Sequence, residues 1–351
     1  MLKRILFILA LLVAFLVLAV GVVLWDTQDK WFLRRPDIKF APMRDDAIKD
    51  PDNPTKIFRV DMAQVEQDYP LGRTDLAKLK PEHIRALAQE EIDQIYGRIT
   101  AGPIPDGVYH GDLIFPRPDS ANETYATQAQ LMVQRLRRMV AVVVPIGSVR
   151  PPRLEEALGG VDGLVAGARL ALVEQVGRTM WKGKVFYRDR RMLRNLIEDW
   201  SLKLAKGIIA IDDQGAIEKI SIPRTGNLLH FVLPTIRVNL MFPAKLHCGQ
   251  SLIDGRREAI LLDYAFNDDL PGYQKNPDGL VGRNGLHVLD EMRMIRPGFY
   301  LGRGYINRMF VLNFTLYNPK VAEAGVASFA RGEPISEDCW PGEQLRHATA
   351  N

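Results

Sequence analysis

The sequence has few cysteines and histidines and lacks the motifs that usually hold metals or nucleotides. Its 351 residues include 2 cysteines and 6 histidines, with no Cys-x-x-Cys, no His-Glu-x-x-His and no closely paired histidines. The glycine-rich stretch 97–107 lacks the Gly-Lys-Ser/Thr of a phosphate loop, and Ser251 lacks the Gly-x-Ser-x-Gly pattern of a hydrolase nucleophile. We therefore predict no metal and no cofactor. The sequence offers no catalytic motif, and on balance we favour a protein that is not an enzyme.

The two cysteines, Cys248 and Cys339, lie far apart in the sequence. In an oxidising compartment they could form one disulfide. A disulfide also needs close geometry that the sequence does not show. Both states stay open at this stage, and we favour two free, buried thiols.

Neither basic nor acidic residues are in large excess. The chain has 46 basic and 42 acidic residues, a formal net charge of +4. No basic block of the kind that follows a phosphate backbone occurs. We therefore predict no nucleic-acid partner.

Only one hydrophobic run is long enough to cross a membrane, and it lies at the N-terminus. "MLKRILFILALLVAFLVLAVGVVLWD" places Lys3 and Arg4 before an uncharged run at 5–25. About 20 apolar residues span a bilayer as a helix, and the basic residues stay in the cytoplasm. A cleaved signal peptide is the alternative, but no small-x-small site follows the run. We predict an uncleaved anchor in a bacterial inner membrane, with the body in the periplasm.

Composition and periodicity divide the chain into five parts. Residues 1–26 form the cytoplasmic stub and transmembrane anchor, and 27–80 read as a membrane-proximal linker. Residues 81–180 are mainly helical in pattern, 181–318 are a string of short antiparallel strands, and 319–351 form a polar tail. The fold class is therefore α+β, with a curled sheet or β-barrel, because closure hides the edges of such strands.

Spacing and caps predict individual elements. Helices are expected at 81–97, 125–144, 151–180 and 190–207. Strands are expected at 107–115, 181–187, 216–222, 235–242 and, as a hairpin about an Asp254-Gly255 turn, at 245–266.

The stretch 286–318 reads as three strands joined by two-residue turns at Pro297-Gly298 and Asn307-Arg308. With these turns Asp290, Arg303 and Tyr305 fall on one face. The apolar residues predicted on that face include Met292, Leu301, Phe310, Leu312 and Phe314. The opposite face, with Glu291, Arg293 and Asn313, reads as solvated. A register slip of one residue would reverse this assignment.

An acid and an arginine on an apolar face have two interpretations. They could anchor the polar group of a ligand in an apolar cavity, or form a structural ion pair that fixes strand register. His247, predicted opposite Leu262, is the histidine best placed for an interior polar role. His110 and Asp112 could form an acid–base pair in a loop, although a loop polar cluster is the alternative.

The run 290–318 and the stretch "MWKGKVF" (180–186) carry a resemblance to known proteins. The C-terminal half is similar in style to lipocalin-like (calycin-type) β-barrels, and "MWKGKVF" resembles their Gly-x-Trp-x-Gly strand. It departs from that motif because Thr179 stands at the first glycine. The run 290–318 also resembles uncharacterised bacterial exported proteins with an N-terminal anchor. The resemblance implies a site for a small apolar ligand and supplies no catalytic residue.

The sequence thus predicts a membrane-anchored exported protein that binds or shuttles a lipid or another apolar molecule. Its ligand-binding residues would be Arg303, Asp290, Tyr305, Met292, Leu301, Phe310, Leu312, Phe314 and His247. Two alternatives remain: an enzyme acting on an apolar substrate through His247 or His110, and an envelope scaffold that binds a protein partner through its helical half.

Overall fold

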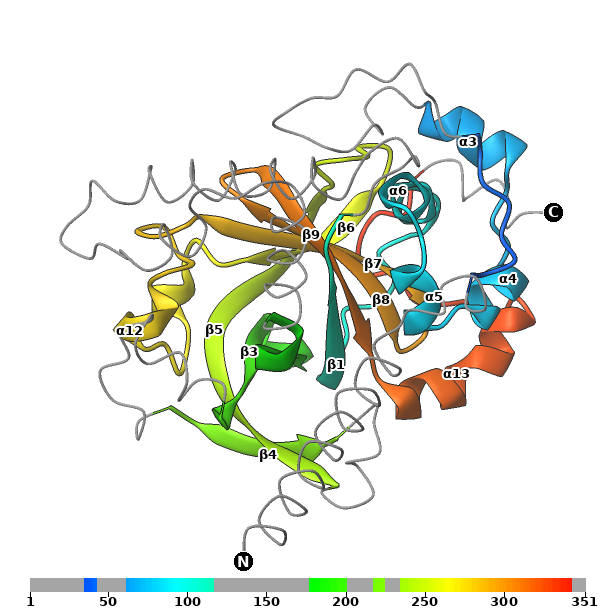
Figure 1. Ribbon diagram of the computed structural model, residues 1–351. Helices are drawn as coiled ribbons and strands as arrows, with labels where there is room; N and C mark the ends of the chain where they lie inside the picture. Colours follow the sequence, from blue (N-terminus) through cyan, green and yellow to red (C-terminus); the bar gives the residue numbers. More distant parts are fainter. Residues whose placement is uncertain (1–34, 43–60, 117–176, 201–216, 225–233, 343–351) are drawn as a thin grey trace, which may run out of the picture.

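The computed structural model describes residues 35–42, 61–116, 177–200, 217–224 and 234–342 (Figure 1). The predicted anchor, the predicted helix 125–144 and most of the predicted helix 151–180 lie outside these residues. Among the helices of the described residues, none is long and apolar enough to cross a membrane.

The described strands form one antiparallel sheet that closes into an eight-stranded barrel. Its order is β3-β2-β1-β9-β8-β7-β6-β5-β4, and pairing of β3 with β5 closes the barrel and leaves β4 beside β5. The strands are β1 (Gly107–Ile114), β2 (Trp181–Tyr187), β3 (Met192–Glu198), β4 (Lys219–Pro223), β5 (Thr235–Gln250), β6 (Glu258–Asp263), β7 (Val288–Arg296), β8 (Phe299–Ile306) and β9 (Met309–Tyr317).

The barrel interior is lined by side chains that alternate along each strand. An eight-stranded barrel encloses a space that side chains fill, or that holds one small ligand. The interior core has inward residues from every barrel strand, among them Tyr109, Phe186, Leu193, Leu246, Leu262, Met292, Tyr300 and Phe314. Apolar residues at every second position of these strands point to the same side of the sheet, and together they form this core.

One end of the barrel is closed by two chain segments. The segment 99–104 leads into β1, and its Ala101 and Ile104 pack in the interior core with Cys339 from the C-terminal part. The Glu337 carboxylate accepts hydrogen bonds from Thr100 Oγ1 at 2.6 Å and from the Gly102 N–H at 2.7 Å. We call this the closed end, where β1 begins and β7 ends. The far end is where β2 and β7 begin.

Most of the helices in the described residues gather on one side of the barrel, against β7, β8 and β9, whereas α12 lies beside β5 (Figure 1). They are α3 (Met62–Asp68), α4 (Arg73–Lys78), α5 (Pro81–Arg85), α6 (Gln89–Arg98), α12 (Lys275–Asp278) and α13 (Pro319–Ala330), with short 3-10 turns η2 (Arg188–Arg190) and η3 (Asn267–Asp269). An outer core of Leu79, Ile84, Leu87, Ile92, Ile95, Phe299 and Leu301 joins these helices to the wall.

The helix prediction for 190–207 is wrong where the structure describes it. Residues 192–198 form β3, which pairs with β2 on one side and β5 on the other. Every residue of β3 is buried, so no solvent-exposed face remains for an amphipathic helix. Sheet pairing overrides the local helical spacing here. The predicted helix 81–97 is confirmed as two helices, α5 and α6, separated by residues 86–88.

The predicted strands at 107–115 and 181–187 are confirmed as β1 and β2. The predicted two-residue turn at Asp254-Gly255 is wrong, because β5 ends at Gln250 and β6 begins at Glu258. The intervening loop is held by Asp254, whose buried carboxylate accepts hydrogen bonds from Arg256 and Arg293. Asp254 therefore holds the loop through contacts with arginine side chains and does not form the two-residue turn that we expected.

Both turns predicted within 286–318 are confirmed, because Arg296 lies opposite Phe299 and Ile306 opposite Met309. The predicted register is wrong by one residue between β7 and β8, whereas Tyr305 lies opposite Phe310 on β9 as predicted. A bulge between Met294 and Arg296 shifts the pairing, so that Asp290 faces Gly304. A bulge adds one unpaired residue and reverses which face the following side chains take.

The register shift separates the predicted polar cluster. Arg303 lies opposite Glu291 and Asn313 on the outer face of the wall, whereas Asp290 points into the barrel. The face that we expected to be solvated is buried under α6, and Glu291, Arg293 and Asn313 are each 0% exposed. The sheet formed by β7, β8 and β9 thus carries buried polar side chains on both of its faces.

Candidate functional site

The barrel interior contains a buried lysine, Lys184, on β2. Its Nζ donates hydrogen bonds to Asn195 Oδ1 at 2.9 Å, to the Tyr264 phenol oxygen at 2.7 Å and to Asp290 Oδ2 at 3.0 Å. An ammonium group has three protons, so these three acceptors match all of them. The four side chains come from β2, β3, the end of β6 and β7, and closure of the barrel brings them together.

The acceptors are themselves held in place by neighbours. Asn195 accepts from the Trp181 indole N–H at 2.9 Å and donates to the Phe242 carbonyl at 3.0 Å. The Tyr264 hydroxyl donates to Asp290 Oδ2 at 3.3 Å. We call Lys184, Asp290, Tyr264, Asn195 and Trp181 the interior polar site. Its hydrogen bonds fix both the lysine and the carboxylate in one arrangement.

Aromatic rings surround the ammonium group. Lys184 Nζ lies 5.5 Å from the centroid of Trp181, 5.4 Å from that of Tyr264 and 5.3 Å from that of Phe314. Gly302 on β8 makes room for the Phe314 ring, because a Cβ built there would lie 2.1 Å from Phe314 Cζ. A cation within about 6 Å of a ring centroid is attracted by the ring quadrupole.

Burial shifts the pKa values within the interior polar site. Loss of water lowers the pKa of Lys184, and the charge and hydrogen bond of Asp290 oppose that shift only in part. The pKa of Tyr264 is raised well above its usual value, first by burial and then by the charge of Asp290. The site therefore keeps the proton on the Tyr264 phenol, and the Lys184 ammonium group loses a proton more easily than it would in water.

The interior polar site lies toward the far end of the barrel. Trp181 is at the first position of β2, and Asp290 is near the start of β7. Several apolar side chains that pack against the interior core are only partly buried, among them Trp181, Phe242, Val281, Val288 and Leu312. The Asp290 side chain is 12% exposed, whereas that of Lys184 is 3% exposed. Of the two charged groups, Asp290 is therefore the more exposed.

A second polar cluster lies outside the barrel, between α6 and the wall. Arg303 forms an ion pair with Asp93 of α6 and donates through Nε to the Tyr305 phenol at 3.0 Å. Tyr305 donates to Glu291 Oε1 at 2.9 Å, and the same oxygen accepts from Ser251 at 3.0 Å. This outer cluster joins α6, the 251–257 loop and the strands, as the structural interpretation of Arg303 requires.

The structure divides the predicted site residues between two locations. Asp290, Met292, Leu312 and Phe314 lie inside the barrel. Leu301 belongs to the outer core, and Tyr305 and Phe310 pack on the outer cluster, where Arg303 stacks on Phe310 with 4.2 Å to its centroid. Whether any of them binds a ligand stays a prediction.

The histidines do not join the interior polar site. His247 lies opposite Leu261 rather than Leu262 and is exposed, which corrects its predicted interior position. His110 lies on β1, and burial lowers its pKa. Asp112 forms ion pairs with Arg85 and Arg178. This arrangement favours the polar-cluster interpretation of Asp112.

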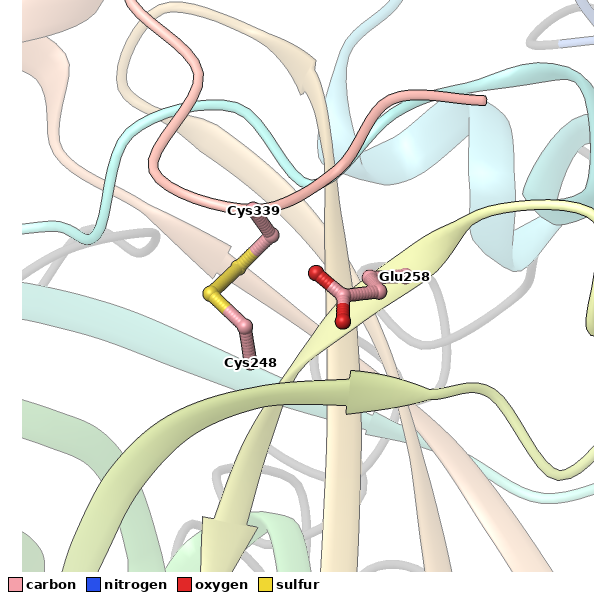
Figure 2. A group of neighbouring side chains, drawn as sticks. All are labelled: Cys248, Glu258 and Cys339. Carbon is pink, nitrogen blue, oxygen red and sulfur yellow. A yellow bond between two sulfur atoms is a disulfide. The ribbon is translucent and has the colours of Figure 1, made fainter. Parts of the chain in front are cut away.

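Cys248 and Cys339 form a disulfide, which corrects our preference for free thiols. Figure 2 shows the Glu258 carboxylate beside it. Glu258 Oε2 accepts a hydrogen bond from the Trp340 N–H at 2.8 Å. With both sulfur atoms in the disulfide, this group ties the C-terminal part to β5 and β6 and closes one end of the barrel.

Sequence reasoning missed Lys184, Asn195 and Tyr264 as members of one site. Lys184 lies two positions before Phe186 on β2, so both side chains point into the barrel. A lysine at a position that the alternation predicts to be inward was therefore the available signal. Asn195 could not be found because its segment read as a helix. Comparison of the chain with protein-family models, with curated proteins and with solved structures finds no match.

Proposed function

We propose that this protein binds a small apolar molecule at the far end of its barrel, with the polar group of the ligand at the interior polar site. The observation that carries the proposal is a buried lysine–aspartate pair among apolar and aromatic side chains. Ligand sites commonly combine apolar walls with a few convergent polar groups. Here Lys184, Tyr264 and Asn195 supply donors, and Asp290 supplies an acceptor that remains partly exposed.

The apolar part of the ligand would lie against Leu312, Val288 and Phe242, which keep partial exposure around the site. A lipid or another molecule with an apolar chain and one polar end fits this arrangement. Arg303 and Tyr305 would contribute indirectly, by fixing the register of the strand that carries Gly304. The resemblance to lipocalin-like barrels supports the same class of ligand.

Binding can be tested with a variant that fills the site. Gly304 faces the interior opposite Asp290, and a Cβ there would lie 3.3 Å from Asp290 Oδ1. Gly304→Leu should therefore occlude the far end. Native mass spectrometry and solvent extraction of the purified full chain should show a bound apolar molecule in the wild type and at least a tenfold loss in the variant.

Gly255→Ala is the matched control, because a Cβ at Gly255 meets nothing within 4 Å. It should retain the ligand. If the wild-type chain yields no ligand and binds neither decanol nor decanoic acid in titrations, the proposal is wrong.

We also propose that residues 5–25 anchor the protein in an inner membrane with the barrel on the periplasmic side. The charge pattern of Lys3 and Arg4 before an uncharged apolar run supports this orientation. The disulfide is consistent with an oxidising compartment. The chain should remain in the membrane after an alkaline carbonate wash, and protease added to spheroplasts should digest the barrel domain. Release by carbonate would contradict the anchor.

A further inference from the structure

We propose that Lys184 captures apolar aldehydes or ketones as a reversible imine. The inference rests on the proposed function, because it assigns a carbonyl group to the polar end of the ligand. Its basis is geometric: an amine, a carboxylate and a phenol meet at one point inside an apolar barrel. Nothing in the proposed binding function by itself requires a primary amine at that point.

An imine requires an amine nitrogen with a free electron pair. Desolvation favours the neutral form of a lysine, and buried lysines in proteins form such bonds with carbonyl compounds. Lys184 is 2% exposed, and the rings of Trp181, Tyr264 and Phe314 keep water from its ammonium group. The lowered pKa of Lys184 agrees with this environment.

The neighbouring groups match the proton transfers of the reaction. Asp290 first takes one proton from the Lys184 ammonium group. The neutral nitrogen then attacks the carbonyl carbon and forms a C–N bond, while the carbonyl oxygen takes a proton from the Tyr264 hydroxyl and the nitrogen gives one of its protons to the Tyr264 oxygen. Asp290 then passes its proton to the departing hydroxyl group, so the C–O bond breaks, one water leaves and both Asp290 and Tyr264 return to their starting forms. No oxidant or reductant is needed, and hydrolysis reverses each step.

The same geometry would stabilise the product. A protonated imine keeps the positive charge at the position of Nζ, 3.0 Å from Asp290 Oδ2 in the free protein. The hydrogen bond to Asp290 would therefore be retained as a charged pair. Tyr264 and Asn195, the other two partners of Nζ, would be released, because the nitrogen of a protonated imine keeps only one of the three ammonium protons.

The test uses the full chain in detergent at pH 7 with decanal as the probe, followed by reduction with sodium cyanoborohydride. The reduced adduct is stable, and peptide mapping locates it. We expect Lys184 to be labelled at least tenfold faster than Lys78, whose side chain is 76% exposed. Labelling of Lys184 no faster than of Lys78 would overturn the proposal.

Variants separate chemistry from folding. Lys184→Arg keeps a cation but should give no adduct at position 184, and Asp290→Asn should slow adduct formation at Lys184 by about tenfold or more. Thermal melting checks that each variant is folded. If a variant does not fold, the labelling ratio within the wild-type protein still decides the proposal.

Decanol separates this inference from the proposed function, because it has the same chain length and no carbonyl group. If decanol binds and decanal leaves no adduct on Lys184, the binding function stands and the imine is wrong. If neither decanol nor decanal binds, both proposals fail.

Discussion

At the scale of single residues, the most consequential feature is a charge pair inside the barrel. Lys184 and Asp290 satisfy each other and are further satisfied by Tyr264 and Asn195. A buried ion pair need not stabilise a fold relative to an apolar core, but removal of one partner leaves an uncompensated charge. This asymmetry gives a direct test of the pair.

We expect Asp290→Leu or Lys184→Met alone to lower the free energy of unfolding by about 3–5 kcal/mol. The double variant should recover most of that loss, because no buried charge remains. Denaturant titration of the four proteins measures the coupling. If the double variant loses as much stability as the two single variants together, Lys184 and Asp290 do not interact.

The pH dependence of stability follows from the lowered pKa of Lys184. Below 10.5, the ordinary lysine value, the unfolded chain keeps this proton more readily than the folded chain. Stability should therefore rise as the pH increases from the lowered folded pKa toward 10.5. Lys184→Met should lack this rise, whereas the exposed Lys78→Met should keep it. Identical pH profiles for wild type and Lys184→Met would count against the shift.

The measurement should stop near pH 10. Burial raises the pKa of Tyr264, Tyr96 and Tyr300 well above the usual value. Above pH 10 the unfolded chain loses tyrosine protons that the folded chain retains, so stability falls again. The two effects occupy different pH ranges and can be distinguished.

At the scale of elements, β8 depends on two inward glycines that serve different purposes. At Gly302 a Cβ would overlap the Phe314 ring at 2.1 Å, whereas at Gly304 its nearest contact is 3.3 Å away. Gly302→Ala should therefore lower the free energy of unfolding by about 1–3 kcal/mol through overpacking. Gly304→Ala should cost clearly less in the same denaturant titration.

A companion change tests the cause. Phe314→Leu in the Gly302→Ala background should relieve the overlap and recover part of the loss. If Gly302→Ala and Gly304→Ala are equally stable, the close approach of Phe314 to β8 is not what requires glycine.

Helix α6 differs from the other described helices because all ten of its residues are buried although several are polar or charged. Gln89 accepts from Asn313 at 2.7 Å, and Asp93 pairs with Arg303. Burial is the main cause that raises the pKa of Asp93, and Arg303 opposes it. The helix thus docks on the barrel wall through matched polar groups as well as through the outer core.

At the scale of the whole molecule, the disulfide joins the C-terminal part to the barrel. It links positions 91 residues apart, and closure of a loop of that size restricts the unfolded chain by roughly 4–5 kcal/mol in the chain-entropy model. We expect Cys248→Ala with Cys339→Ala to lower the free energy of unfolding by about 2–5 kcal/mol.

Denaturant titration with and without reductant measures this effect. Reductant should bring the wild type close to the double variant and leave the variant unchanged. A double variant as stable as the oxidised wild type would contradict a structural role for the disulfide.

Much of the fold follows from local sequence. The turns at Pro297-Gly298 and Asn307-Arg308 and the strands at 107–114 and 181–187 agree with their patterns. Their signals, alternation and turn residues, are contained within a few positions of the chain. The antiparallel barrel follows from the same signals, because a run of short strands has edges that closure removes.

The candidate site could not be predicted in the same way. Asp290 was recognised as a charged residue among apolar neighbours, but its hydrogen-bond partners, Lys184 on β2 and Tyr264 after β6, lie far from it in the sequence. Two bulges, one near Ile295 and one between β8 and β9 next to Gly304, placed Arg303 on the opposite face, and no local feature of the sequence required them.

The sequence by itself determined most of the strands, the two turns within 286–318 and the expectation of a curled or closed sheet, because these depend on interactions between residues close along the chain. Only the tertiary structure decided the register, the disulfide and the pairing of Lys184 with Asp290. The physical reason is the period of two in a strand: a single extra residue exchanges the inner and outer faces, and only the packing of the whole barrel selects which arrangement buries its charges in pairs.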